Sequence, residues 1–249
     1  MYVKKLKIIN TGFSMRKTLF CGNKDIFRHK IREININKDK KIFELLSNIY
    51  IYKFPPVLYW YEGYYKDIPV DYVIAMRKIF EHTSSAVLEK INELCFAFNA
   101  EYSSYGDNII ILPIEYIYGN YDKRLFLDSF AHEIGHALYD SLTLDAGMES
   151  QISACHKIIK FYSKRFSQNL FYDPGVSELS LAGYQLEDCR EFFPELFLNV
   201  LNYYEELIAH ICSIKYTEAA GAYLYMTEIM LKHLTPFGKR EKREILTSL

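Results

Sequence analysis

The chain of 249 residues lacks several features that would place it in a familiar class of protein. Its five cysteines are odd in number and never spaced as CxxC, which argues against a disulfide framework and against a thiolate metal site. Its apolar runs are far shorter than the ~20 residues that a membrane-spanning helix needs. The 30 basic and 31 acidic residues leave a net charge of -1, so no overall field favours nucleic acid or anionic lipid. We therefore expect neither a nucleic-acid partner nor a membrane span.

The N-terminal segment also lacks the marks of an export signal. Lysines near the start are not followed by an uninterrupted apolar stretch of about 7–15 residues before Arg16 and Lys17. The bulky Phe20 before Cys21 is unlike a lipoprotein cleavage site. We expect a soluble protein that is cytoplasmic in the producing cell or is exported by a route other than Sec. The sequence leaves the oligomeric state open.

The composition is that of a globular chain, with 50% hydrophobic and 24% charged residues. This length can bury a substantial core within one domain. The apolar pattern of the first half mixes short extended runs with helical stretches, whereas the second half is largely helical. We predict an α+β fold in a single domain, residues 1–249, with a mixed-sheet lobe at 1–121 and a mostly helical lobe at 122–249.

Hydrophobic periodicity also predicts the individual elements. Helical spacing occurs in six segments: 41–52, 84–98, the segment that begins at Asp122, 150–166, 187–213 and 217–234. Runs of strand length occur at 3–9, 31–36 and 109–112. Residues 114–118 are interpreted as an irregular sheet edge, and the basic residues of 238–243 as a solvated tail.

A metal-binding motif lies near the middle of the chain, His132-Glu133-Ile134-Gly135-His136. Two histidines four residues apart on a helix project from one face, so both imidazoles can reach one ion. Glu133 points about 100° around the helix, where it can take a proton from water beside the ion. Gly135 keeps the helix surface low for close packing. We predict a zinc site with Glu133 as general base; the alternative is a chance HExxH in a helix that binds nothing.

A catalytic zinc ion usually takes three protein ligands, so a third donor is needed. The class of zinc proteases that uses a third histidine places it six residues after the second. Leu142 occupies that position here, so this class is excluded. Glu191, on a later predicted helix, is the best placed carboxylate. Glu195 follows one turn on and could accept the second N–H of a liganding histidine, as an outer-shell orienting group. The alternative is that both glutamates lie on the surface of an amphipathic helix.

Taken together, HEIGHALYD, Tyr184 and the Glu191-Phe-Phe-x-Glu-x-Phe pattern closely resemble the zinc metalloprotease family that includes the catalytic domain of anthrax toxin lethal factor and the clostridial Pro-Pro endopeptidases. The resemblance covers roughly residues 108–234. It implies that His132, His136 and Glu191 bind one Zn²⁺ ion and that Glu133 is the base. It also implies that Tyr184, seven residues before Glu191, stabilises the transition state by donating to the developing oxyanion.

The resemblance further implies that 109–112 and 114–118 form the sheet rim to which a peptide substrate adds as an extra strand, with Tyr116 and Tyr118 lining the cleft. The sequence departs from the family at Pro194, which removes a helical hydrogen bond and can kink the helix that carries Glu195. The resemblance stops short of the delivery domains of lethal factor, for which we expect no room in this chain.

These observations predict a zincin of the thermolysin-like, glutamate-liganded type. Its expected activity is zinc-dependent endopeptidase cleavage of a peptide or protein substrate, as in a toxin-like or effector-like protease. The substrate and its cleavage preference are left open. Two alternatives are a catalytically silent zincin-fold module that binds protein, and a zinc hydrolase acting on something other than peptides, which would need a small closed pocket instead of a groove.

Overall fold

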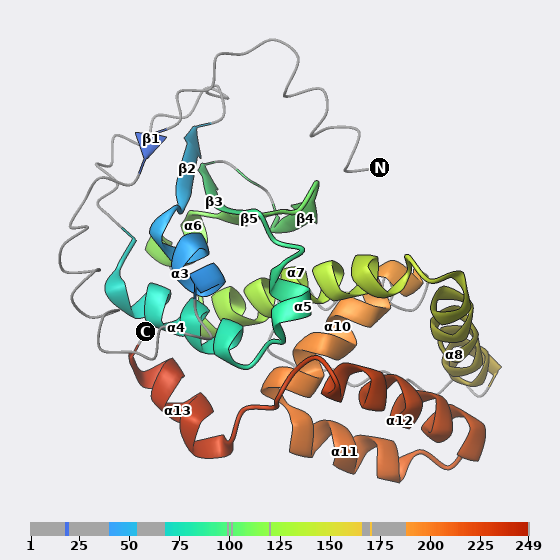
Figure 1. Ribbon diagram of the computed structural model, residues 1–249. Coiled ribbons are helices and arrows are strands. Elements are labelled where there is room, and N and C mark those ends of the chain that lie inside the picture. Colours follow the sequence, from blue (N-terminus) through green and yellow to red (C-terminus); the bar gives the residue numbers. More distant parts are fainter. Residues whose placement is uncertain are drawn as a thin grey trace.

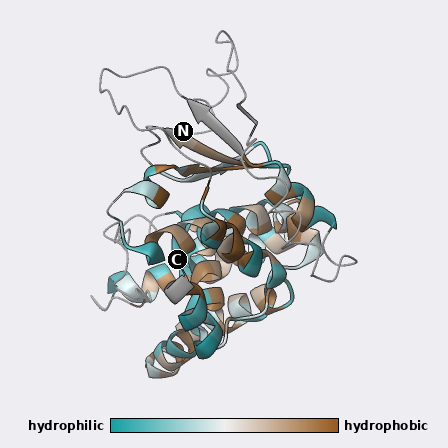
Figure 2. Cartoon of the chain, turned by 90° about the vertical axis from the view of Figure 1, so that its left-hand side faces the viewer, coloured by the Kyte–Doolittle hydropathy of each residue, from teal (hydrophilic) through white to brown (hydrophobic). Residues whose placement is uncertain are grey.

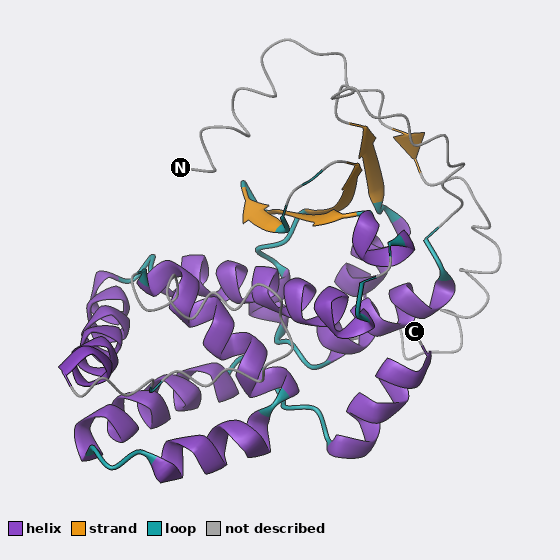
Figure 3. Ribbon diagram, turned by 180° about the vertical axis from the view of Figure 1, so that it is seen from behind, coloured by secondary structure: helices purple, strands orange, loops and turns teal. Residues whose placement is uncertain are grey.

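The chain combines one mixed β-sheet with a larger set of helices, an α+β architecture (Figure 1). The computed structural model describes the following residues: 18–19, 40–53, 68–98, 100, 102–119, 121–165, 170 and 188–248. Within these, every strand precedes residue 114, and the elements after that residue are all helices (Figure 3). The strands expected at 3–9 and 31–36 lie outside the described residues.

The sheet has the strand order β1-β2-β3-β5-β4. Its strands are β1 Thr18–Leu19, β2 Tyr50–Lys53, β3 Glu93–Phe98, β4 Ser104–Gly106 and β5 Ile109–Pro113. Strands β2, β3 and β5 are parallel, whereas β4 pairs antiparallel with β5 and forms an edge. Asp107 and Asn108 join β4 to β5 with φ values of 51° and 63°, the left-handed conformation that tight hairpins require and that these residue types tolerate.

Two predictions for the first half were wrong in extent. The helix expected over 41–52 ends at Ser47 as α3 Lys40–Ser47, and the following residues form β2. The helix expected over 84–98 is only α5 Ser85–Leu88, after which the chain enters β3. Strand β3 is buried on both faces, so its continuous apolar run lacks the alternation that distinguishes a strand from a helix. Helix α4 Val70–Glu81 was not assigned from the sequence.

The predicted edge at 114–118 was also wrong, because those residues include the single-turn helix α6 Glu115–Tyr118. In the second half the helix starting at Asp122 is confirmed as α7 Lys123–Leu142, and Asp122 caps it by accepting a bond from the Arg124 N–H. The helices that follow are α8 Ala146–Arg165, α10 Cys189–Asn202, α11 Tyr204–Ser213, α12 Thr217–Leu231 and α13 Lys239–Ser248.

Two further corrections concern this second half. The single helix predicted at 187–213 is broken at Tyr203, where φ is -136° and the backbone leaves the helical region. The basic segment 238–243 is largely exposed, as predicted, but it is not a tail, because residues 239–243 belong to α13, which buries Ile245 against the core. Among the residues described, no helix is both long and apolar enough to cross a membrane.

Helix α7 lies beneath the sheet and carries the core between the two layers. Three phenyl rings stack in a row between the two layers. The ring of Phe126 on α7 lies 6.4 Å from that of Phe96 on β3 and 6.2 Å from that of Phe130 on α7, measured between centroids. Phe80 and Tyr72 of α4 meet the same row edge-on. In Figure 2 the strands are largely hydrophobic, whereas the helices carry hydrophilic residues on their outer faces. Aromatic packing thus fixes α7 against the sheet on one side, leaving its other side for α10.

Candidate metal centre

The two histidines of the motif lie side by side near the middle of α7. The ring centroids of His132 and His136 are 4.9 Å apart, with an interplanar angle of 72°. Both side chains are half-buried. One helical turn separates them, as the sequence predicted, so their Nε2 atoms face the same space.

Glu191 reaches that space from the first turn of α10, whose N-cap is Asp188. Its Oε2 atom lies 3.4 Å from Nε2 of His132 and 3.6 Å from Nε2 of His136. One ligand atom from each of the three residues lies within 4.8 Å of the others. Two atoms bound at about 2.1 Å to a tetrahedral zinc ion would be about 3.4 Å apart. This His-His-Glu group could therefore hold a metal ion with little movement.

Gly135 explains how α10 comes this close to α7. A Cβ atom at Gly135 would lie 2.6 Å from Cα of Pro194 and 3.0 Å from its Cβ and its carbonyl oxygen. Real Cβ atoms do not approach backbone this closely, so only glycine is accommodated here without displacement. The packing role expected for Gly135 is confirmed, and its partner is the proline that departs from the family pattern.

Glu195 faces the histidines in spite of Pro194. Its Oε2 lies 3.2 Å from Nδ1 of His132, the ring nitrogen that is turned away from Glu191. A carboxylate in this position accepts the Nδ1–H and leaves Nε2 as the atom available to a metal ion. The cluster thus contains two imidazoles and two carboxylates. Helix α7 contributes both imidazoles, and α10 contributes both carboxylates.

The charges in this cluster shift one another's protonation in the metal-free protein. Burial lowers the pKa of His132, but hydrogen bonds to Glu191 and Glu195 and the nearby charge of Glu133 outweigh it and raise that pKa to about 10. Burial raises the pKa of Glu191, but its bonds to His132 and His136 hold that pKa well below the ordinary range. A metal ion bound here would replace a proton on His132.

Glu133 lies beside this cluster and is only 3% exposed. Its Oε2 atom is buried and accepts no hydrogen bond from any residue that the structure describes. Buried polar atoms are nearly always paired, so an unpaired carboxylate oxygen beside a group that could hold a metal ion makes Glu133 a candidate for a chemical role.

The other predicted site residues are less closely grouped. Tyr184 lies outside the described residues. Tyr116 is 6% exposed and Tyr118 is 40% exposed, and the expectation that they line a substrate cleft stays a prediction. The rim predicted at 109–112 was wrong for a topological reason, because β5 is paired on both sides and β4 is the last described strand on that side of the sheet.

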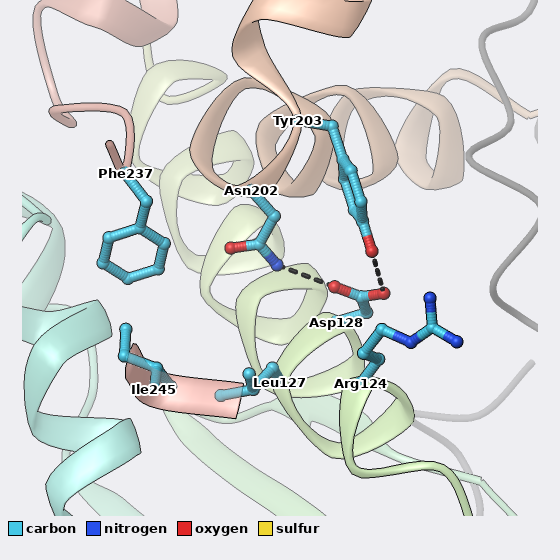
Figure 4. Close-up of a pocket in the computed structure, with 7 residues that line it drawn as sticks. All are labelled: Arg124, Leu127, Asp128, Asn202, Tyr203, Phe237 and Ile245. Carbon is cyan, nitrogen blue, oxygen red and sulfur yellow. Dashed lines mark hydrogen bonds between the residues drawn. The ribbon is translucent and has the colours of Figure 1, made fainter. Parts of the chain in front are cut away.

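A second polar cluster at the other end of the α7–α10 contact was not foreseen from the sequence (Figure 4). Asp128 is 7% exposed and accepts a bond of 2.7 Å from the Asn202 side-chain amide and one of 3.0 Å from the Tyr203 hydroxyl. A small cavity beside it is bounded by Leu127 and Phe237, among others. One feature of the sequence could have indicated this cluster. Asp128 is a charged residue one turn before His132, among positions that the apolar pattern of the predicted helix assigns to the core.

Comparisons with protein-family models, with curated proteins and with solved structures found no match. The functional assignment of this chain is therefore based on the chemistry and geometry of its own residues.

Proposed function

We propose that the protein is a zinc-dependent endopeptidase with a zincin fold of the glutamate-liganded type. The observation that carries the proposal is the position of Glu191 Oε2, 3.4 Å and 3.6 Å from the Nε2 atoms of His132 and His136, with the carboxylate of Glu133 alongside. Two imidazoles and one carboxylate are the donor set of catalytic zinc sites that keep one position open. The resemblance to the lethal factor family supports the same ligand set.

The arrangement of the sheet supports a peptide as the substrate. Strand β4 is one of the two terminal strands among those described, and it packs against α7, the helix that carries the motif. An extended peptide can add to such an edge through main-chain hydrogen bonds. The sheet edge in our proposal is therefore β4, instead of the rim at 109–118 expected from the sequence.

The proposed roles of the residues follow from their positions. Zinc, when bound by His132, His136 and Glu191, would polarise the scissile carbonyl and acidify a water molecule. Glu133 would take a proton from the attacking water and deliver it to the nitrogen of the leaving amine, so that one peptide bond and one water molecule become a carboxylate and an amine. Glu195 would hold the tautomer of His132. By resemblance, Tyr184 would donate to the developing oxyanion.

The proposal is tested by incubating the zinc-loaded protein with a proteome-derived peptide library and identifying the products by mass spectrometry. We expect internal cleavage that is abolished by a zinc chelator and restored by zinc. Glu133→Gln should retain one zinc ion per chain and lose at least about 100-fold in kcat, the usual contribution of a general base. A zinc-loaded protein without any cleavage product would favour the binding module, and full activity in Glu133→Gln would refute the mechanism.

A further inference from the structure

The first turn of α10, which carries Glu191, lacks one backbone hydrogen bond of an ordinary helix. Proline has no N–H group, so Pro194 cannot donate to the carbonyl oxygen of Arg190 four residues before it. The turn begins with the bonds that the N–H groups of Glu191 and Phe192 donate to the carbonyl oxygen of Asp188, at 3.2 Å and 3.0 Å. Side-chain packing must therefore contribute more than usual to the direction of Glu191.

The residue after Glu191 is held between rings from two other helices. Helices α8 and α12 both pack on α10 (Figure 1), and the side chain of Phe192 is buried where they do so. Its ring centroid lies 5.1 Å from that of His156 on α8 and 5.8 Å from that of Tyr223 on α12, which it meets edge-on. Because Phe192 directly follows Glu191 in the chain, a movement of its ring displaces the backbone that carries the carboxylate.

The ring of Tyr223 is itself fixed at both ends. Its backbone belongs to α12, and its hydroxyl donates to the carbonyl oxygen of Leu170 at 3.0 Å. The same carbonyl oxygen lies 2.7 Å from Nε2 of His210 on α11. The N–H group of Leu170 donates to the hydroxyl oxygen of Ser163 on α8 at 3.4 Å. The Tyr223 hydroxyl therefore meets an acceptor whose position is set by two further helices.

We infer that Tyr223 is a positioning residue for Glu191. By holding the ring of Phe192, it keeps the first turn of α10 where Glu191 Oε2 lies 3.4 Å and 3.6 Å from the Nε2 atoms of His132 and His136. The inference rests on the proposed zinc site and adds what directs its third ligand. Residues that orient a metal ligand from outside the coordination sphere typically contribute about 10–100-fold to metal affinity.

The test compares Tyr223→Leu, which removes the ring, with Tyr223→Phe, which keeps the ring and removes only the hydroxyl. We expect the Kd for Zn²⁺ to rise about tenfold or more in Tyr223→Leu and less than about threefold in Tyr223→Phe. The visible absorption of the Co²⁺-loaded protein should change in Tyr223→Leu alone, because a displaced Glu191 alters the coordination geometry. The matched control is Phe96→Leu, which removes an equally buried ring that packs on Phe126 in the other layer. It should lower stability and leave zinc affinity and the cobalt spectrum as in the wild type.

A second variant and a second measurement cover the case in which Tyr223→Leu does not fold. Phe192→Leu removes the ring that Tyr223 holds, with a smaller loss of volume, and should weaken zinc binding in the same direction. In the metal-free protein, hydrogen exchange of the amides at 189–193 should be faster in Tyr223→Leu and Phe192→Leu than in Phe96→Leu, because the first turn of α10 opens more readily.

Wild-type zinc affinity in Phe192→Leu, or exchange at 189–193 no faster than in Phe96→Leu, would overturn the inference. A wild-type protein that binds neither Zn²⁺ nor Co²⁺ would instead refute the proposed metal site. The exchange measurement would then still decide whether Tyr223 orders the turn that carries Glu191.

Discussion

Two buried carboxylates on α7 lie in contrasting surroundings. Asp128 is 7% exposed, and its two oxygens accept bonds from Asn202 and Tyr203. Glu133 is 3% exposed, and its Oε2 accepts no bond from the described residues. The two lie five residues apart on α7, about 140° around its axis, so they face different neighbours. Asp128 meets the neutral donors at the end of α10, whereas Glu133 lies beside the histidine cluster.

The comparison indicates how to separate a structural polar group from a reactive one. A buried carboxylate whose oxygens are paired stabilises the contact between two helices, and it specifies their relative position. A buried carboxylate with an unpaired oxygen costs free energy and is retained where it serves another purpose. Asp128 therefore belongs to the scaffold of the α7–α10 contact, whereas Glu133 is the residue for which we propose a chemical role.

The largest effect is expected where α10 packs most closely on α7, at Gly135, just after Glu133. Gly135→Ala would place a Cβ atom 2.6 Å from Cα of Pro194, so the helices must separate. We expect a loss of about 3 kcal/mol in the free energy of unfolding, as for overpacked cores, and weaker zinc binding because Glu191 moves with α10. The measurements are urea unfolding and zinc affinity.

The matched control for this change is Gly221→Ala on α12, where an added Cβ would meet nothing within 4 Å. It should raise stability by up to about 1 kcal/mol through helix propensity. Equal effects of the two alanines would show that close packing at Pro194 does not limit the approach of α10.

A pair of carboxyl-to-amide changes tests the comparison itself. Asp128→Asn puts an amide N–H where a carboxylate oxygen accepted a charge-assisted bond, and we expect a loss of about 2 kcal/mol in unfolding free energy. Glu133→Gln replaces an oxygen that has no partner among the described residues, so stability should stay within about 1 kcal/mol or rise. Both are measured by urea unfolding of the metal-free protein, and the reverse order of the two effects would contradict the assignment of roles.

The smallest effect concerns protons at the histidine cluster. In the metal-free protein the pKa of His132 is raised to about 10, so a proton must leave when a metal ion binds near neutral pH. Zinc affinity should therefore rise about tenfold per pH unit between pH 6 and 7.5, equivalent to about 1.4 kcal/mol per unit. Titration calorimetry in buffers of different ionisation enthalpy measures the released proton, and affinity independent of pH would contradict this prediction.

The same pKa shift has a consequence for folding. Because the folded pKa of His132 lies above the ordinary value of 6.5, its contribution to the stability of the metal-free protein is present below about pH 6.5 and is lost as pH rises toward 10. The pKa of Glu191 is lowered, so its contribution is present above its ordinary pKa of 4.5 and is lost as pH falls below that value. The cluster should therefore stabilise the folded metal-free protein most between about pH 4.5 and pH 6.5.

Sequence reasoning succeeded where the determining interactions are local. The start of α7 at the Asp122 cap and the pairing of His132 with His136 follow from contacts within one or two helical turns. It failed for β3, which was assigned to a helix. The apolar residues of β3 are buried by pairing with β2 and β5, and this long-range pairing leaves no alternating pattern in the sequence. The break at Tyr203 was missed for a related reason, since its hydroxyl is bound by Asp128 far away in the chain.

The sequence by itself determined the chemistry that this protein can carry: two imidazoles on one helix face, Glu133 between them, and a candidate third carboxylate at Glu191. Only the tertiary structure decided that this carboxylate reaches the histidines, because the approach depends on the fit of Pro194 against Gly135. It also decided that β4, and not β5, is the last described strand on the side of the sheet that packs against α7. Helical periodicity acts over a few residues, whereas these contacts join segments that meet only after the chain has folded.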